Sequence, residues 1–268
     1  MNQIAIFSVP RSGSTWLGQI FNSHPEVLYR FQPNMAYSFP LTLSESSTEA
    51  EIQAFFEALR LTEDPFTTAR ISISGKPNPQ FAKTSPTTLV FKETHYLYII
   101  DNLIRNSGTR VIGLVRSPFA TMNSWIKAPK EFHPEWDLEA EWLDAPKKNL
   151  GNPRNFFGYN KWKEGALLFL ELQGKYPDRF MSVQYERLLA EKLPAVESLF
   201  RFCGLSMTEQ TRAFIARSES KDDAQDTYSV FRTKTNDLAW KNGLPTFITE
   251  AIMADPEFQT LNKHFCWA

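Results

Sequence analysis

The sequence lacks an excess of charge of either sign, and it contains very little cysteine. It has 29 lysines and arginines against 30 aspartates and glutamates, so its net charge is close to zero. A nucleic-acid-binding protein usually needs a broad cationic surface, so we expect no nucleic-acid partner. Two cysteines, Cys203 and Cys266, are too few for a disulfide framework or a four-ligand zinc site. They fit a reducing compartment, and we expect Cys203 to be a buried small hydrophobe.

Long apolar runs, repeats and metal-ligand clusters are also missing. No apolar run approaches the roughly 18 residues that a membrane-spanning helix needs, and no fixed-period repeat occurs. No basic segment followed by an apolar stretch and a cleavage site begins the chain, so we expect a cytoplasmic protein. The histidines are scattered without metal-ligand spacing, and we expect no bound metal.

What the sequence does contain is an alternation of short apolar runs with helical stretches. The apolar runs predict buried strands at residues 4–9, 89–91, 111–115 and 180–184. Helical spacing occurs at residues 49–61, 96–106, 119–126, 159–174, 193–203 and 208–217. The alternation predicts an α/β fold, with a central parallel sheet flanked by helices. At 268 residues the chain fits one such domain.

Two stretches with several prolines and little periodicity interrupt this pattern. They lie at about residues 62–88 and 127–157, and both predict long loops. The second stretch also contains Trp136 and Trp142. Long loops in compact domains often shape a binding site, so we expect these two to shape the site of a substrate. Packing of the tryptophans beneath a surface loop is the alternative.

The first chemical motif follows the first apolar run, at residues 10–16, and reads Pro-Arg-Ser-Gly-Ser-Thr-Trp. A loop between a strand and a helix places backbone N–H groups and hydroxyls at the positive end of the helix dipole, which suits a phosphate. Gly13 permits a backbone conformation that a side chain would obstruct. The glycine and the Gly-Lys-Ser/Thr core of a Walker loop are absent, and Arg11 is the nearby cation. The motif indicates a phosphate site that is not an ordinary nucleoside triphosphate loop; a plain helix N-cap is the alternative.

A second motif begins with Arg116 at the end of an apolar strand, continues through Pro118 at a helix start, and ends with Ser124 in that helix. Alone, Arg116 could be a surface charge. With the first loop, however, the chain resembles the sulfotransferases that use 3′-phosphoadenosine 5′-phosphosulfate (PAPS). In that family a strand-end arginine and a helical serine at this spacing hold the 3′-phosphate. Residues 184–188 and 231–234 resemble two later segments of the family.

This resemblance implies a P-loop-like α/β fold, PAPS as the sulfate donor and adenosine 3′,5′-bisphosphate (PAP) as the product, with no metal required. It also implies which residues bind the donor. Those on the 5′ side would be Arg11, Ser12, Gly13, Ser14 and Thr15, with Trp16 near the adenine. Those at the 3′-phosphate would be Arg116, Ser124, Arg232, Thr233 and Lys234, with Tyr185 touching the nucleotide.

The base that would deprotonate the acceptor is the less defined part of the resemblance. Residues 92–95, Lys-Glu-Thr-His, are similar to the Lys-Thr-His segment of the cytosolic branch, whose histidine is the base, but contain one extra residue. In an extended strand, Lys92 and Thr94 would share one face, and Glu93 and His95 the other. Either the chain bends after Lys92 and His95 is the base, or Glu93 is. In both cases Lys92 would stabilise the bridging oxygen.

The reaction implied by the resemblance is in-line transfer of a sulfuryl group to an acceptor hydroxyl. Arg11 and the loop N–H groups would stabilise charge on the bridging oxygen, by analogy with phosphoryl transfer. Residues 21–33 are similar to the carbohydrate branch, which favours a sugar acceptor over a lipid or another small metabolite. Gln32, however, stands where that branch often has a glutamate base, and an amide takes up no proton near neutral pH. The sequence leaves the acceptor and the oligomeric state open.

Two other functions fit parts of the sequence. A nucleotide or small-molecule kinase with a degenerate phosphate loop would explain residues 10–16, but the Walker lysine is absent. A noncatalytic scaffold that binds a nucleotide or a glycan would explain the departure at Gln32. Binding of PAP without binding of ATP would argue against the kinase, and transfer of sulfate would argue against the scaffold.

Overall fold

The computed structural model of the chain describes residues 1–33, 39, 41–220, 229–231 and 236–268. At its centre is a five-stranded sheet in the order β2-β3-β1-β4-β5, with every neighbouring pair parallel. The strands are β1 (Asn2–Ser8), β2 (Val27–Phe31), β3 (Thr88–Glu93), β4 (Arg110–Val115) and β5 (Phe180–Gln184). The expected single α/β domain with a central parallel sheet is confirmed.

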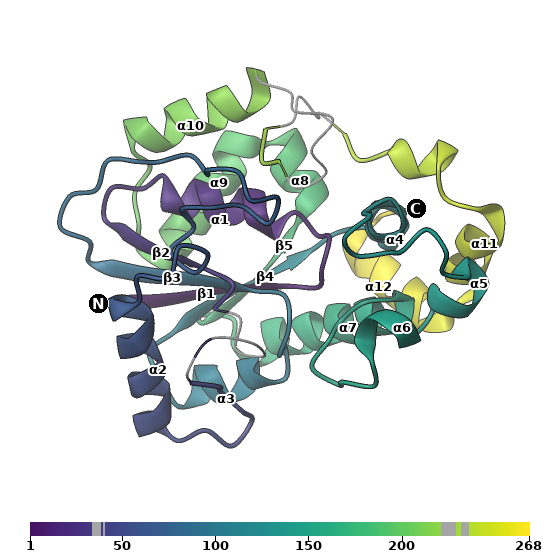
Figure 1. Ribbon diagram of the computed structural model, residues 1–268, viewed down its shortest axis with the longest axis horizontal. Coiled ribbons are helices and arrows are strands. Elements are labelled where there is room, and N and C mark those ends of the chain that lie inside the picture. The colour runs from purple at the N-terminus through teal and green to yellow at the C-terminus, as the bar shows by residue number, and fades with distance from the viewer. Residues whose placement is uncertain (34–38, 40, 221–228, 232–235) are drawn as a thin grey trace.

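Helices cover both faces of this sheet (Figure 1). One face carries α1 (Ser14–Asn22), α8 (Tyr185–Ala190), α9 (Lys192–Cys203) and α10 (Glu209–Ser220). The other carries α2 (Glu49–Leu61), α3 (Ile99–Arg105) and α7 (Tyr159–Lys175). Beside the carboxyl ends of the strands lie α4 (Pro118–Ile126), α5 (Leu138–Glu141), α6 (Pro146–Asn149), η1 (Ala239–Asn242), α11 (Thr246–Ala254) and α12 (Pro256–Phe265).

The central strand β1 explains why the sheet is buried on both faces. Its side chains alternate, so Ile4 and Ile6 pack into the core beneath α1 while Ala5 and Phe7 pack into the core on the opposite face. All four side chains are at most 1% exposed. A continuous apolar run is therefore what a strand in this position requires.

Helix boundaries follow local signals. Helix α2 begins with a capping box, in which the Thr48 hydroxyl accepts the N–H of Glu51 at 3.3 Å and the Glu51 carboxylate accepts the N–H of Thr48 at 2.7 Å. The helix predicted from residue 96 begins at Ile99 instead. Tyr96 has a φ of 58°, in the left-handed region, and such a residue cannot continue into a right-handed helix.

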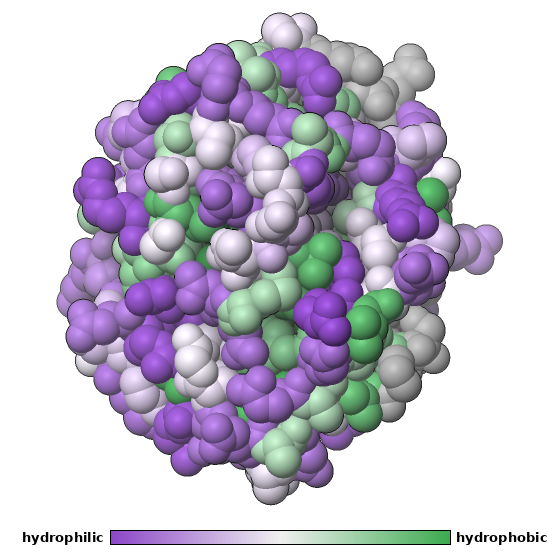
Figure 2. All heavy atoms as spheres, turned by 90° about the vertical axis from the view of Figure 1, so that its left-hand side faces the viewer, coloured by the Kyte–Doolittle hydropathy of each residue, from purple (hydrophilic) through white to green (hydrophobic). Residues whose placement is uncertain are grey.

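The sequence pattern does not predict β2. Its Arg30 interrupts the apolar alternation, but it is buried because its guanidinium donates to the backbone oxygens of Leu59, Tyr29 and Arg60 at 2.5, 3.0 and 3.0 Å. Figure 2 views the molecule from the side on which the N-terminus lies, and polar residues dominate this face with apolar residues interspersed. Among the described residues, no helix combines the length and the apolarity needed to span a bilayer.

The two proline-rich stretches follow largely irregular paths. Residues 62–87 form turns, with an isolated bridge between Ile71 and Pro77. Residues 127–157 contain the two short helices α5 and α6. Both stretches contribute side chains to the cavity described next.

Candidate active site

The loops that follow β1, β3 and β4 open onto one cavity of about 900 Å³. Ligands of open parallel sheets bind beyond the carboxyl ends of the strands, and pockets of this size hold cofactors and small substrates. Arg11, His95 and Arg116, each from a different loop, line the cavity together. The sheet therefore brings the two sequence motifs and the candidate base to one place.

The turn between β1 and α1 has a backbone that few residues tolerate. Arg11 and Gly13 both lie in the left-handed region, with φ of 67° and 88°. A Cβ atom on Gly13 would lie only 2.3 Å from the Cε2 atom of Tyr185, so the tyrosine ring packs directly over the glycine. The residues of this turn that line the cavity are Pro10, Arg11, Gly13, Ser14, Thr15 and Trp16. Ser12 is buried beneath the turn and is not one of the described residues that line the cavity.

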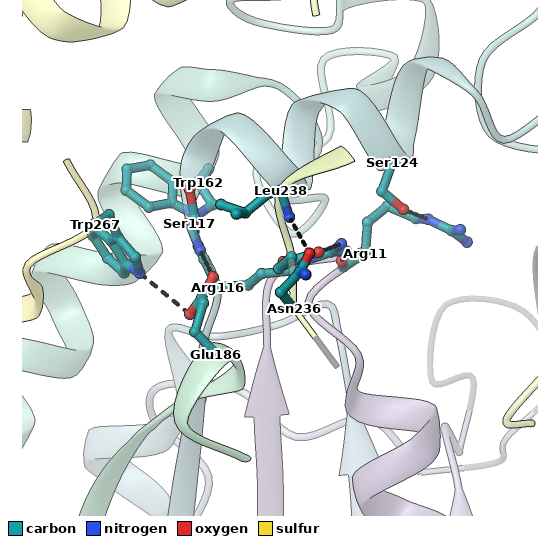
Figure 3. A network of polar contacts seen from close by, with 10 residues as sticks. Arg11, Arg116, Ser117, Ser124, Trp162, Glu186, Asn236, Leu238 and Trp267 are labelled. Atoms are coloured by element: carbon teal, nitrogen blue, oxygen red, sulfur yellow. Dashed lines mark hydrogen bonds and ion pairs between the residues drawn. The ribbon is translucent and has the colours of Figure 1, made fainter. Parts of the chain in front are cut away.

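Arg116 follows β4, and its guanidinium contacts Asp237, Arg11 and Tyr185; Figure 3 shows it beside Arg11. Its Nε and Nη2 atoms donate to the two carboxylate oxygens of Asp237 at 2.6 and 2.7 Å, and its Nη1 atom donates to the backbone oxygen of Arg11 at 2.6 Å. The guanidinium lies over the ring of Tyr185, 4.9 Å from its centroid. Burial lowers the pKa of Arg116, but the pairing with Asp237 outweighs it and raises that pKa. Arg116 is a buried cation with a bidentate carboxylate partner.

Glu186 contacts the turn that follows Arg116 and the C-terminal residues. Its carboxylate accepts the backbone N–H of Ser117 at 2.8 Å and the indole N–H of Trp267 at 3.3 Å. The indole of Trp162 donates to the backbone oxygen of Arg116 at 3.0 Å (Figure 3). Burial raises the pKa of Glu186. These contacts tie the turn between β4 and α4 to α7, α8 and the C-terminal residues.

A hydrogen bond between Arg11 and Ser124 connects the loop after β1 to α4. The hydroxyl of Ser124, on α4, accepts a hydrogen bond from Nε of Arg11 at 3.2 Å. Arg11 therefore meets Arg116 through its backbone oxygen and Ser124 through its side chain. The loop at residues 10–16 and the second motif are therefore joined by two hydrogen bonds.

Trp16 also lines the cavity, with its ring edge-on to Tyr185 at a centroid distance of 6.3 Å. Its indole N–H donates to the hydroxyl of Ser218 on α10 at 3.2 Å. The last predicted donor contacts, Arg232, Thr233 and Lys234, lie outside the described residues.

The chain bends at the end of β3. The strand ends at Glu93, whose Oε1 atom accepts the backbone N–H groups of Thr94 and His95 at 2.7 and 3.1 Å. This turn places Lys92, Thr94 and His95 in the cavity wall. Glu93 is 1% exposed and is not one of the described residues that line the cavity. Of the two candidate bases, His95 is the one that faces the cavity.

Burial dominates the titration of these three groups. It lowers the pKa of His95 to about 4 and that of Lys92 to about 8, and it raises the pKa of Glu93 to about 7. His95 is therefore neutral near neutral pH. The Nζ atom of Lys92 donates to Oε1 of Gln32 at 3.4 Å and lies 4.7 Å from the ring centroid of Phe31.

Residues 127–157 form one side of the cavity, and this side contains both lysine and aromatic side chains. Lys148 pairs with Glu131 at 2.7 Å and lies 4.8 Å from the ring centroid of Phe157. From the first proline-rich stretch, Phe66 and Ile73 reach the cavity. The side chains from the second stretch are Lys127, Lys130, Glu131, His133, Trp136, Lys147, Lys148, Leu150, Asn155 and Phe157, with Pro129 between them.

A profile of a protein family described as "Sulfotransferase domain" matches residues 1–255 of the chain. The chain belongs to the sulfotransferase family. This sulfotransferase is 24% identical to mouse carbohydrate sulfotransferase 5 and to human carbohydrate sulfotransferase 6, over 90% of its own length and 75% of theirs. A solved structure of a mouse sulfotransferase complexed with PAP superposes on the whole chain and on 89% of that chain, with a TM-score of 0.59 at 15% identity. The similarity to that structure agrees with the fold described above.

Within the described part of this sulfotransferase, no group of three or more histidine, cysteine, aspartate or glutamate side chains is placed to hold a metal ion. Both cysteines are free thiols, Cys203 buried and Cys266 exposed. Burial raises the pKa of the Cys203 thiol, as expected for a packed, unreactive side chain.

Among the polar residues at the site of this sulfotransferase that were not predicted from the sequence are Asp237 and Asn155. Asp237 follows a basic segment, and its negative charge alone does not indicate that it pairs with an arginine at the end of a distant strand. Asn155 lies in a stretch without periodicity, and its Oδ1 atom is 3.0 Å from Nδ1 of His95. Each contact joins residues far apart in the chain, which no local pattern can indicate.

Proposed function

We propose that this sulfotransferase moves a sulfuryl group from PAPS to an acceptor hydroxyl. One observation carries the proposal: the phosphate loop and Arg116 line the same cavity as Lys92 and His95. An anionic donor and a proton acceptor would therefore share one chamber. The family membership supports the reaction class, and the proposal adds the donor and the roles of the residues.

The 5′ end of the donor would lie at the N-terminus of α1. The first N–H groups of a helix have no intrahelical partner and carry a partial positive charge, so they bind phosphate or sulfate oxygens. Ser14 and Thr15 would add hydroxyl donors and Arg11 a full charge. Ser12, being buried, would act by supporting the turn. The adenine would lie near Trp16 and Tyr185.

The 3′-phosphate would lie at Arg116 and Ser124. Asp237 now accepts hydrogen bonds from two nitrogen atoms of Arg116. A phosphate making the same two bonds would have to displace this carboxylate. Because a guanidinium also binds phosphate in a bidentate manner, the exchange would replace one charge-assisted pair by another.

In the chemical step the acceptor oxygen would attack sulfur while the bond between sulfur and the bridging oxygen of the 5′-phosphate breaks. The acceptor proton would pass to Nε2 of His95, and the electron pair of the broken bond would leave with PAP. Arg11 and Lys92 would offset the charge that grows on the bridging oxygen. His95 can take the role because it faces the cavity and its ring is neutral near neutral pH, which leaves one nitrogen able to accept a proton.

The acceptor would lie against residues 127–157. Aromatic rings such as Trp136 and Phe157 in this wall offer flat apolar surfaces, and the lysines beside them offer hydrogen-bond donors. The two curated relatives are named carbohydrate sulfotransferases. We therefore propose a sugar hydroxyl as the first acceptor class to test, followed by lipids and small metabolites.

Calorimetric titration tests the donor site. We expect PAP to bind with a dissociation constant in the micromolar range or below, and ATP not to bind. Arg116→Ala should weaken PAP binding at least about tenfold, because a charge-assisted hydrogen bond contributes roughly 1.5–3 kcal/mol. Arg105→Ala removes an arginine of α3 that pairs with Asp101, and it should leave PAP binding unchanged. Comparable binding of ATP and PAP would contradict the proposal.

A further inference from the structure

Asn155 holds the imidazole of His95, and its two hydrogen bonds determine which ring nitrogen carries the proton. The amide Nδ2 atom of Asn155 donates to the backbone oxygen of Asn149 at 3.1 Å. Its Oδ1 atom therefore faces the other way, 3.0 Å from Nδ1 of His95. An amide oxygen can only accept, so Nδ1 must be the donor. In a neutral imidazole this leaves Nε2 with its lone pair free to accept a proton.

The orientation of Asn155 is itself well determined, because Asn149 anchors the loop. Asn149 is 6% exposed, and its amide group donates to the backbone oxygens of Asp144 and Phe157, both at 2.8 Å. Its Oδ1 atom accepts the backbone N–H of Phe157 at 3.2 Å. The carbonyl that receives the Asn155 amide therefore belongs to a fixed part of the chain.

The ring of His95 is constrained on its other sides as well. Its backbone N–H donates to Glu93, and its ring packs against Phe157 at a centroid distance of 6.1 Å. The charged groups that act on it are Lys92 from β3, and Glu131 and Lys148 from residues 127–157. None of these three contributes a hydrogen bond to the ring among the described contacts, so the amide of Asn155 is the group that selects the tautomer.

We propose that Asn155 is a positioning residue that keeps the proton of His95 on Nδ1 and thereby presents Nε2 to the acceptor hydroxyl. This inference rests on the proposed function, in which His95 is the base. The hydrogen bond survives the reaction, because an imidazolium donates from both nitrogens and Asn155 need not move. A neutral amide, unlike a carboxylate, adds no charge that would hold the proton on the ring after transfer.

Nitrogen-15 NMR of the histidine side chains tests the tautomer without any substrate. The chain has four histidines, and the signals of His95 are identified by their loss in His95→Gln. We expect the neutral ring to show a protonated Nδ1 and an unprotonated Nε2. In Asn155→Ala we expect a mixture of the two tautomers. A wild-type ring protonated on Nε2 would overturn the inference.

Kinetics supply the second readout. Asn155→Ala should lower kcat about threefold to tenfold, the factor that the loss of one hydrogen bond produces, with PAP affinity kept. Asn155→Asp places a carboxylate beside Nδ1 and should move the acid limb of the kcat profile to higher pH by about one unit or more. Asn152→Ala is the control in the same loop, since Asn152 is not one of the described residues that line the cavity and its side chain accepts only the backbone N–H of Arg154 among the described contacts. It should keep both the rate and the pH profile.

Failure of the inference and failure of the proposed function give different results. If wild-type protein transfers no sulfate, the proposed function fails, and the NMR spectrum still reports the tautomer. If sulfate is transferred but neither kcat nor the pH profile changes in the Asn155 variants, the positioning role alone is wrong.

Discussion

Single residues determine the electrostatics of the cavity, and the pairing of Arg116 with Asp237 is the most buried ion pair among the described residues. The side chains are 10% and 3% exposed. Removing one partner from a buried pair leaves an uncompensated charge and typically costs about 3–5 kcal/mol. If the proposed donor site is correct, this pair links the stability of the protein to binding of the donor.

Asp237→Asn should strengthen PAP binding about threefold to tenfold while lowering the stability of the unliganded protein. The physical reason is that a phosphate no longer competes with a carboxylate for the guanidinium. Calorimetric titration gives the affinity, and thermal unfolding with and without PAP gives the stability. Asp101→Asn, at a partly exposed side chain of α3, is a control that should change neither the affinity nor the PAP-induced shift. Weaker PAP binding in Asp237→Asn would mean that Asp237 must hold Arg116 while the phosphate binds.

The low pKa of His95 makes a prediction about stability. Burial lowers the pKa of His95 from 6.5 to about 4. Between these two pH values the imidazole is protonated in the unfolded chain and neutral in the folded protein. Stability is therefore lost as the pH falls from 6.5 towards 4. Urea unfolding of wild type and His95→Gln across this range should show the variant losing less, by about 1–3 kcal/mol. The same pH dependence of the unfolding free energy in both proteins would contradict the lowered pKa of His95.

At the scale of elements, the junction from β1 to α1 combines a predicted motif with a contact that only the fold creates. The strand, the small polar loop and the helix follow from local patterns in residues 4–22. The ring of Tyr185 over Gly13 does not, because it comes from the end of β5, which β4 separates from β1 in the sheet. Sequence periodicity predicts elements well and their neighbours only through the rules of parallel sheets.

Gly13→Ala should abolish PAP binding, because the new Cβ meets both an unfavourable backbone angle and the Tyr185 ring at 2.3 Å. Gly75→Ala is a matched control. It has a similar φ of 83° but no atom within 4 Å of the new Cβ, so it should lose only about 1–2 kcal/mol of stability. Calorimetry with PAP on both variants gives the comparison. Equal PAP affinity in the two variants would show that the contact with Tyr185 is unimportant.

Across the whole molecule, the site is assembled from segments that no local pattern connects. The alternation of strands and helices predicts the parallel sheet, and such a sheet predicts that the ends of β1, β3 and β4 meet. The strand β2 is not predicted because it contains the charged Arg30. This side chain is buried only because it donates hydrogen bonds to backbone oxygens about 30 residues further along the chain. Asp237 and Asn155 are not predicted as site residues because they lie in loops, whose paths no local sequence pattern indicates.

The C-terminal residues extend this long-range assembly to the far end of the chain. Trp267 donates to the partly buried carboxylate of Glu186 and packs on Trp162 and Phe265 at centroid distances of 5.5 and 4.6 Å. Trp267→Phe keeps much of the ring packing and removes the donor. It should therefore lower the free energy of unfolding by about 1–3 kcal/mol, as measured by urea unfolding. An unchanged unfolding midpoint would mean that water replaces the indole at Glu186.

Transfer of radiolabelled sulfate from PAPS to a panel of sugar, lipid and small-molecule acceptors tests the central claim most directly. We predict that the wild-type protein labels at least one acceptor hydroxyl. His95→Ala should do so about 10²–10⁴ times more slowly, with its affinity for PAP within about twofold of wild type, as expected when a general base is removed. Wild-type protein that binds PAP but labels no acceptor would contradict the account and favour a noncatalytic scaffold.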